Sequence, residues 1–222
     1  MDIFTNKSVV VTGAAGALGL TVANAFAHAG ANVTGIDVID FKADFRTLKA
    51  NLIELESTKT ALAEVRSVDI LVNIAGGFTM GDTVAGTSDE TWDFMFDLNA
   101  RTVLNTVRTI VPVMVEQGAG KIINIGARAA LRGSANMAAY AASKSVVIRL
   151  TESLADELKH EGINVNCILP SIIDTERNRA DMPDADFSSW VSPEALAKVV
   201  LFLASQESNP IHGAALPVEG LA

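Results

Sequence analysis

The sequence predicts an α/β fold, in which helices cover both faces of a doubly wound parallel sheet. Short β-branched runs alternate with longer amphipathic runs along the whole chain, and this alternation is typical of a parallel sheet enclosed on both sides. Residues that favour helix ends stand where the longer runs begin and stop. The chain has 222 residues, of which 49% are hydrophobic, enough for one sizeable core and few for two. We therefore expect a single domain over residues 1–222.

The expected strands are the short runs and the expected helices are the amphipathic ones. Strands are expected near residues 8–12, 32–36, 69–74, 121–125, 163–169 and 214–218. Helices are expected near residues 17–29, 58–66, 88–116, 137–160 and 193–204. The segment 37–57 is short for a complete passage of strand, helix and strand, so a reduced crossover is expected there.

Several helix boundaries carry recognisable signals. The sequence TSDE at 87–90 fits a capping box, and Ser192-Pro193 fits an N-cap followed by the first helical residue. Glycines stand where three helices should stop: Gly30, Gly118 and Gly162.

Composition narrows the choice of partner. A net charge of −9 with only 17 Lys and Arg argues against nucleic acid or an anionic membrane, which both require a basic surface. A small molecule is the expected partner. The N-terminal sequence has no secretory signal pattern, and no apolar run approaches the roughly 18 residues of a membrane span, so a cytoplasmic location is expected. Cys167 is the only cysteine, and its strand context predicts a buried, inert thiol.

The sequence VVVTGAAGALG predicts a dinucleotide-binding turn. An apolar strand runs into Gly13, Gly16 and Gly19, and an apolar helix follows. Glycines allow a tight turn close to a pyrophosphate, and the helix N-terminus offers unpaired N–H groups. An ordinary strand-to-helix turn is the alternative, but this motif follows the first strand directly, which favours a Rossmann-type domain.

Asp37 indicates which dinucleotide would bind. It ends the second expected strand, where a carboxylate can accept hydrogen bonds from the adenosine ribose and repel a 2′-phosphate. The residues around it, Ala14, Ala15, Val38 and Ile39, supply no Arg or Lys to pair with that phosphate. NAD(H) is therefore favoured over NADP(H), although an aspartate in an exposed turn remains an alternative.

Tyr140 and Lys144 form the candidate catalytic pair. They lie four residues apart at the start of an expected helix, so the phenol and the amine share one face. The lysine ammonium and a cationic nicotinamide nearby are both expected to favour the phenolate and to make Tyr140 a usable acid or base. The alternative is a core tyrosine beside a solvated lysine.

Together these motifs resemble the short-chain dehydrogenases/reductases over nearly the whole chain. The matching residues are TGAAGALG, NIAGG at 73–77, Asn99 within DLNARTVLN, and Tyr140 with Lys144. One departure is Ala17, where the family usually has a glycine that here stands at Gly16. The resemblance implies that Tyr140, Lys144 and Asn99 are catalytic, Asn99 through a water relay to the lysine, with a capping or packing role as its alternative. It implies cofactor contacts from Gly13, Gly16, Ala17, Leu18, Gly19, Asp37, Asn51, Asn73, Ala75, Gly76, Tyr140, Lys144, Pro170, Ile172 and Thr175.

Ala127 is the chief departure from the family pattern. Family members usually carry a serine thirteen residues before the tyrosine, and that position here is Ala127. Ser134 or Ser143 could replace the hydroxyl if the loop took another path. Losing one of two donors to a ketone oxygen typically costs about 3–4 kcal/mol, whereas a conjugated acceptor spreads the developing charge.

Two segments more closely resemble the quinonoid dihydropteridine reductase subfamily, which uses NADH and also lacks the serine. They are GARAALRGSANMAAYAASK at 126–144 and MPDADFSSWVSPE at 182–194. This resemblance implies dimerisation through long helices, so a homodimer or homotetramer is expected. It also implies an Ala-Gly-Gly after the strand expected near 69–74, matched here by Ala75, Gly76 and Gly77. By contrast, NIAGG and LASQESNPIHGAALPVEG resemble ordinary bacterial reductases of the family.

We therefore expect an NADH-dependent reductase of a small conjugated acceptor, with a quinonoid dihydropterin as the best single candidate. One alternative is a general carbonyl reductase, for example of the 3-oxoacyl type, and another is a catalytically silent NAD(H)-binding sensor. Residues near 176–191 are expected to form a substrate lid. Substrate contacts are expected from Ala127, Gly77 and Trp190, although Trp190 could equally pack on the protein body. No metal is expected, because His28, His160 and His212 lack ligand spacing.

Overall fold

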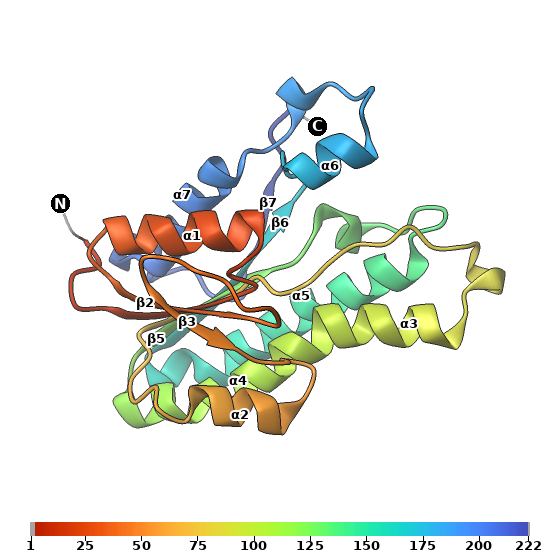
Figure 1. The fold of residues 1–222 in the computed structure, drawn as a ribbon. Coiled ribbons are helices and arrows are strands. Elements are labelled where there is room, and N and C mark those ends of the chain that lie inside the picture. Colours follow the sequence, from red (N-terminus) through yellow and green to blue (C-terminus); the bar gives the residue numbers. More distant parts are fainter. Residues whose placement is uncertain (1–2, 222) are drawn as a thin grey trace.

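One parallel sheet of seven strands organises the protein. The computed structural model describes residues 3–221, so Met1, Asp2 and Ala222 of the expected domain lie outside the described residues. The strand order is β3-β2-β1-β4-β5-β6-β7 (Figure 1). The bounds are β1 Ser8–Thr12, β2 Asn32–Asp37, β3 Arg46–Lys49, β4 Ile70–Asn73, β5 Gly120–Ile125, β6 Ile163–Pro170 and β7 Ala215–Val218. This order confirms the doubly wound fold, and it reverses direction between β1 and β4, where such sheets bind ligands beyond their carboxyl ends.

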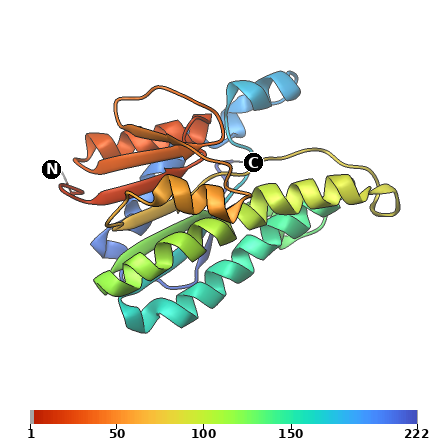
Figure 2. The same ribbon diagram turned by 60° about the horizontal axis from the view of Figure 1, so that its bottom comes forward.

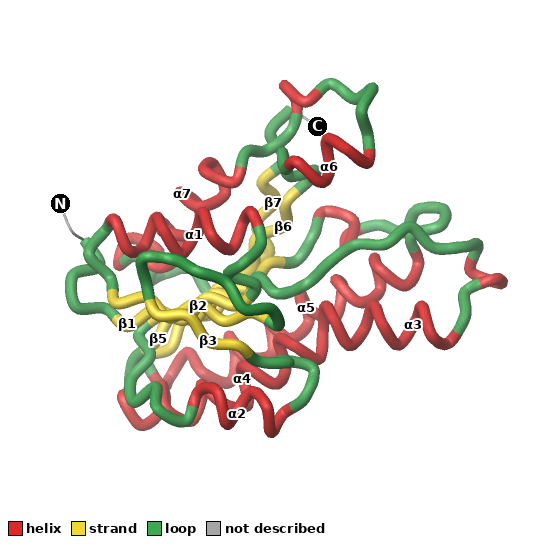
Figure 3. The backbone as a smooth tube through the Cα atoms, viewed as in Figure 1, coloured by secondary structure: helices red, strands yellow, loops and turns green. Residues whose placement is uncertain are grey.

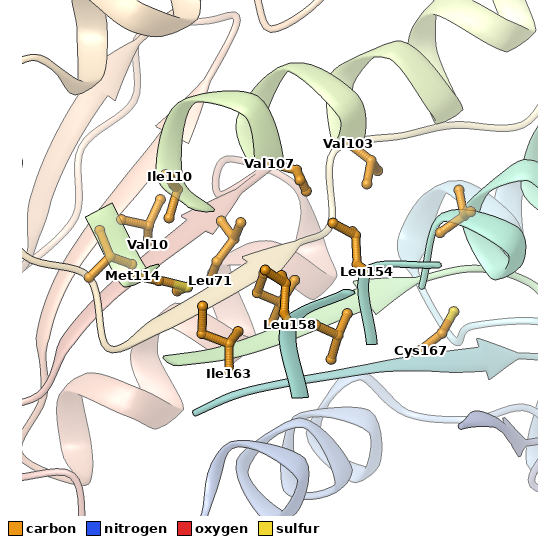
Figure 4. Packing of buried hydrophobic residues seen from close by; sticks show 14 of the residues in the cluster. Val10, Leu71, Val103, Val107, Ile110, Met114, Leu154, Leu158, Ile163 and Cys167 are labelled. Atoms are coloured by element: carbon orange, nitrogen blue, oxygen red, sulfur yellow. The ribbon is translucent and has the colours of Figure 1, made fainter. Parts of the chain in front are cut away.

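Helices cover both faces of the sheet. Figures 1 and 2 show α1 (Ala17–His28) and α7 (Pro193–Ala204) on one face. The other face carries α2 (Leu55–Leu62), α4 (Thr102–Gln117) and α5 (Ala138–Leu158). Successive strand residues point to opposite faces, so Val10 packs under α4 and α5 while Val9 and Val11 pack under α1 and α7. Figure 4 shows the first of these two cores, including Val10, Leu71 and Ile110.

The expected helix at 88–116 is divided by a π-helical segment. It consists of α3 (Asp89–Phe96), the π segment Asp97–Arg101 and α4 (Figure 3). A π turn inserts an extra residue into a helix and is frequent at functional sites. Here it contains Asn99.

Most helix ends agree with their sequence signals. Ser192 caps α7 by accepting a hydrogen bond from Ala195 N, and Gly118 adopts the left-handed conformation expected of a helix stop. The N-cap of α3 is Ser88, one residue after the Thr87 with which the expected capping box begins. The Ser88 hydroxyl oxygen accepts a hydrogen bond from Thr91 N at 3.1 Å. The helix expected at 58–66 is α2, which begins earlier and closes after Leu62, the last residue of that helix buried in the core.

The crossover between β2 and β3 is reduced, as the sequence predicted. Residues 38–45 contain no helix. Instead, Phe41 and Phe45 pack against Gly35 of β2, where a Cβ would lie only 2.7 Å from the Phe45 ring. Two aromatic side chains therefore cover β2 in place of a helix.

A segment outside the sheet follows β6. Residues 174–190 contain α6 (Glu176–Asp181) and the 3₁₀ turn Phe187–Ser189. Its base is closed by hydrogen bonds from Val191 N to Ile172 O and from Asp174 N to Val191 O. None of the helices within residues 3–221 combines the length and apolarity needed to cross a membrane.

Candidate active site

The glycine turn between β1 and α1 fits a dinucleotide pyrophosphate. Gly13 has φ +66°, and a Cβ there would lie 2.8 Å from Ala75 N. At Gly19 a Cβ would lie 2.0 Å from Gly13 O, so both positions require glycine. Gly16 caps α1 without a side chain, and Ala17 and Leu18 begin the helix. The N–H groups of this first turn therefore face a position that no side chain of the cap fills, as an anion site requires.

Asp37 lies beside this turn. It is the last residue of β2, and its carboxylate accepts hydrogen bonds from Ala15 N at 3.0 Å and Val38 N at 2.7 Å. The carboxylate is thus fixed at the carboxyl edge of the sheet, next to the glycine turn. The exposed-turn alternative does not describe it.

Lys144 and Asn99 meet at Gly76, on the loop that follows β4, and Tyr140 lies one turn before Lys144 on α5. Lys144 is 5% exposed and donates to Ile125 O at 2.9 Å. A Cβ on Gly76 would lie 3.0 Å from Lys144 Nζ and 2.7 Å from Asn99 Oδ1. The alternative of a solvated lysine is therefore wrong, because the amine is buried at the end of the sheet beside Asn99.

Burial sets the ionisation of the pair. It raises the pKa of Tyr140 to about 12 and lowers that of Lys144 to about 8. In the protein alone desolvation therefore dominates the pKa of Tyr140, and a lowering of this pKa by Lys144 together with a bound nicotinamide stays a prediction. A phenol with this pKa stays neutral at physiological pH and is suited to donate a proton.

Asn99 holds the main chain of Gly77. Its Oδ1 accepts from Gly77 N at 3.0 Å, and its Nδ2 donates to Gly77 O at 3.1 Å and to Ser143 Oγ at 3.2 Å. These bonds are a packing role of the kind left open by the sequence, and the water relay stays a prediction. Ser143 Oγ in turn donates to Tyr140 O at 2.8 Å, so the suggestion that Ser143 replaces the missing hydroxyl is wrong. Ser134 lies in the exposed part of the loop before α5.

Ala127 stands just after β5 with a buried side chain, 5% exposed. It adopts an extended conformation and precedes the 3₁₀ turn Arg128–Leu131. A buried methyl group therefore occupies the position at which the family usually carries a hydroxyl.

Other expected cofactor residues use their side chains within the protein. Asn73 donates to Asn124 Oδ1 at 2.8 Å and accepts from Thr106 Oγ1 at 2.7 Å, so its amide faces the core. At the turn before α2, Asn51 Oδ1 accepts a hydrogen bond from Ile53 N, and Asn51 Nδ2 donates one to Glu54 Oε1. A contact from Asn73, which is 2% exposed, to a cofactor would have to come from its main chain or follow a rearrangement.

The remaining expected residues lie at the carboxyl edge. Pro170 ends β6, Ile172 is 36% exposed, and Thr175 caps α6 by accepting from Asn178 N. A Cβ on Gly77 would lie 2.9 Å from the Leu98 side chain, so close packing against Leu98 explains why this position is a glycine.

Trp190 packs on the protein body. It is 8% exposed, and its ring lies 4.8 Å from that of Phe187. The structure therefore shows the packing alternative, because little of the ring is available for a substrate to stack on.

Phe78 is a site residue that the sequence reasoning missed. Its ring packs edge to face on Tyr140, with centroids 4.9 Å apart and planes at 86°. The available signal was an aromatic residue directly after Ala75, Gly76 and Gly77. Its contact partner is more than sixty positions away in the sequence, which spacing alone does not indicate.

Comparisons with known proteins agree with this geometry. The family model described as short chain dehydrogenase matches residues 7–186. The 3-oxoacyl-(acyl-carrier-protein) reductase FabG of Chlamydia muridarum is 31% identical over 245 residues, which cover 99% of this chain and 98% of the relative. The dehydrogenase/reductase SDR family member 6 of Rattus norvegicus is 30% identical over 242 residues, with 99% and 98% covered.

A solved structure extends the likeness to three dimensions. A gluconate 5-dehydrogenase from Burkholderia cenocepacia J2315, in complex with NADP and tartrate, has a TM-score of 0.90 and 28% identity, and the match covers 99% of this chain and 96% of that one. The chain belongs to the short-chain dehydrogenase/reductase family and is an NAD(P)-dependent oxidoreductase.

Proposed function

We propose that this protein is an NADH-dependent carbonyl reductase. The observation that carries the proposal is the convergence of Lys144 and Asn99 on Gly76, next to the glycine turn, with Tyr140 one turn before Lys144 on the same helix. A reductase needs a proton donor beside the dinucleotide site, and Tyr140 is a neutral phenol in that place. The similarity to a 3-oxoacyl reductase supports carbonyl chemistry better than the quinonoid dihydropterin first expected.

The protein's own residues would divide the work between proton transfer and orientation. The dinucleotide, when bound, supplies the hydride. Tyr140 would donate its phenolic proton to the carbonyl oxygen and could recover it from solvent. Lys144 would hold the ribose hydroxyls, while Asn99 keeps the Gly76-Gly77 main chain in place. The silent-sensor alternative loses its support because all three residues are present in the site.

Asp37 supports a preference for NAD(H). Its carboxylate is fixed beside the glycine turn by Ala15 N and Val38 N, where a 2′-phosphate would meet a like charge. The gluconate dehydrogenase above binds NADP, so this preference is proposed for the present chain from its own residues.

Ala127 favours a second candidate, reduction of a conjugated acceptor such as a quinone or a quinonoid dihydropterin. A carbonyl on a saturated chain concentrates charge on one oxygen, and Tyr140 is then its only donor from the usual pair. A conjugated acceptor spreads that charge and depends less on the second donor. The two candidates make opposite predictions for restoring the hydroxyl.

We further propose a homodimer or homotetramer that uses the long helices. Helices α4 and α5 lie side by side on one face (Figure 2), and Leu104 and Val115 of α4 are each 38% exposed. Light scattering coupled to size exclusion measures the mass directly, and a monomer at micromolar concentration would contradict this proposal. A cytoplasmic location stays a prediction.

NADH oxidation tests the main proposal. The panel contains simple ketones, an acetoacetyl thioester, quinones and quinonoid dihydropterin, with Tyr140→Phe as the control variant. We expect turnover of at least one carbonyl substrate, reduced roughly 100-fold or more in Tyr140→Phe. Turnover confined to quinones or dihydropterin would favour the second candidate, and no turnover with any acceptor would contradict both.

A further inference from the structure

Phe78 occupies a fixed position over the proton donor. It directly follows Gly77, whose N–H and carbonyl are both bonded to Asn99. Three residues later, Gly81 N donates to Asn136 O at 2.8 Å, which ties the same loop to the segment before α5. The loop that carries Phe78 is thus held on both sides, and its ring contacts Tyr140 at 4.9 Å between centroids.

Much of the Phe78 ring remains open. The residue is 44% exposed, although its other side packs against the only tyrosine of the chain. A large apolar side chain held open beside a catalytic group indicates a binding surface, because burying that area is favourable once a partner arrives.

Three further apolar side chains are exposed on the loops after β5 and β6. Leu131, after β5, is 59% exposed, and Ile172 and Met182, after β6, are 36% and 37% exposed. The loop cations Arg128 and Arg179 form ion pairs with Glu219 and Asp174. Exposed apolar side chains therefore stand among charged residues on these loops, and two of the loop arginines are paired with carboxylates of the chain.

We propose that Phe78 is a specificity-determining residue that selects a carbonyl conjugated to an aromatic or other flat apolar group. The inference rests on the proposed carbonyl reductase function and names its substrate class. It also accommodates Ala127, since conjugation spreads the charge that a second donor would otherwise stabilise. An aromatic substrate would gain contact with the open ring while its oxygen meets Tyr140.

Steady-state kinetics of Phe78→Ala test the proposal with three ketones: acetophenone, cyclohexyl methyl ketone of similar size, and 2-butanone. We expect KM for acetophenone to rise by about tenfold, with kcat/KM for the two saturated ketones within about twofold of the parent protein. Phe78→Trp should keep the preference for acetophenone. Phe94→Ala removes a comparably exposed ring from α3 and should leave all three substrates unchanged.

Other outcomes overturn the inference. A parallel fall in kcat for all three ketones, with a shifted tyrosinate titration at 295 nm, would mean that Phe78 only supports Tyr140. Equal kinetics in Phe78→Ala and the parent would mean that the ring contacts no substrate.

If the parent protein reduces no ketone, the proposed carbonyl reductase function is contradicted independently of the role of Phe78. Calorimetric titration of 1-phenylethanol into the protein with NADH then tests whether Phe78 belongs to an aromatic binding surface. The inference then requires binding that Phe78→Ala weakens at least about fivefold. Absent or unchanged binding would overturn it.

Discussion

Restoring a serine at Ala127 separates the two candidate substrate classes. The side chain is 5% exposed and lies in extended backbone just after β5, so Ala127→Ser adds one oxygen without a backbone change. One donor to a localised oxyanion is worth about 3 kcal/mol in good geometry. Because the hydrogen bond from the new hydroxyl need not have ideal geometry, kcat/KM for simple ketones should rise by one to two orders of magnitude, equivalent to about 1.4–2.7 kcal/mol. A conjugated acceptor should gain little.

The hydroxyl also has a predictable cost in stability. A buried donor without a partner destabilises the folded state by about 1–3 kcal/mol, so the melting temperature without substrate should fall. Ala129→Ser, which places the same group two residues further along, is the control for nonspecific effects on the loop.

The assay is kcat/KM with 2-butanone and with a quinone at saturating NADH. If Ala127→Ser binds NADH normally and raises neither activity, Ala127 does not face the substrate and the charge argument is refuted. If both activities rise equally, the hydroxyl acts without distinguishing substrates and the distinction between the two classes is lost.

Four further predictions concern the same site. Tyr140→Phe should keep NADH binding but lose the tyrosinate absorbance at 295 nm. In the parent protein this absorbance should appear only near pH 12, because burial raises the pKa of Tyr140. A titration midpoint near pH 10 in the parent would contradict the burial argument. Lys144 has a pKa of about 8 in the folded protein, below its ordinary value of 10.5. The free energy of unfolding of the parent protein should therefore rise by up to about 3 kcal/mol as the pH increases from about 8 to 10.5. Urea titrations of Lys144→Met over the same pH range should show no such rise. The parent protein should bind NADH at least about tenfold more tightly than NADPH, a difference of 1.4 kcal/mol, and Asp37→Ala should reduce this difference. Calorimetry that shows equal affinity of the parent protein for NADH and NADPH would contradict the preference itself. Gly76→Ala places a methyl 2.7 Å from Asn99 Oδ1 and 3.0 Å from Lys144 Nζ, so NADH-dependent turnover should fall more steeply than the melting temperature; unchanged kinetics would mean that the loop can move away.

Local signals explain which parts could be predicted from sequence. The strands and most helix ends follow from β-branched runs, capping residues and glycines, and the Tyr140–Lys144 pair follows from spacing within one helix. These features depend on neighbours a few positions away, where chain geometry is nearly fixed. The reduced crossover was predictable because segment length alone limits what it can contain.

Tertiary contacts explain the rest. The contact of Phe78 with Tyr140 and the bonds from Asn99 to Gly77 and Ser143 join segments distant in sequence. The burial that raises the pKa of Tyr140 in the protein alone also depends on such contacts, because spacing reveals the nearby lysine but not the surroundings of the phenol. The π segment at Asp97–Arg101 likewise gives no distinct pattern, because its residues are ordinary helix neighbours.

The short crossover couples cofactor affinity to the order of an edge strand. β3 has four residues, none of them buried, and its continuation at Ala50 donates to Asp37 O at 2.8 Å. A short exposed edge strand opens at low free energy, and here its opening removes a bond from the residue expected to hold the adenosine ribose. NADH should therefore slow amide hydrogen exchange across residues 46–50, and part of its binding free energy would be spent on holding that strand closed.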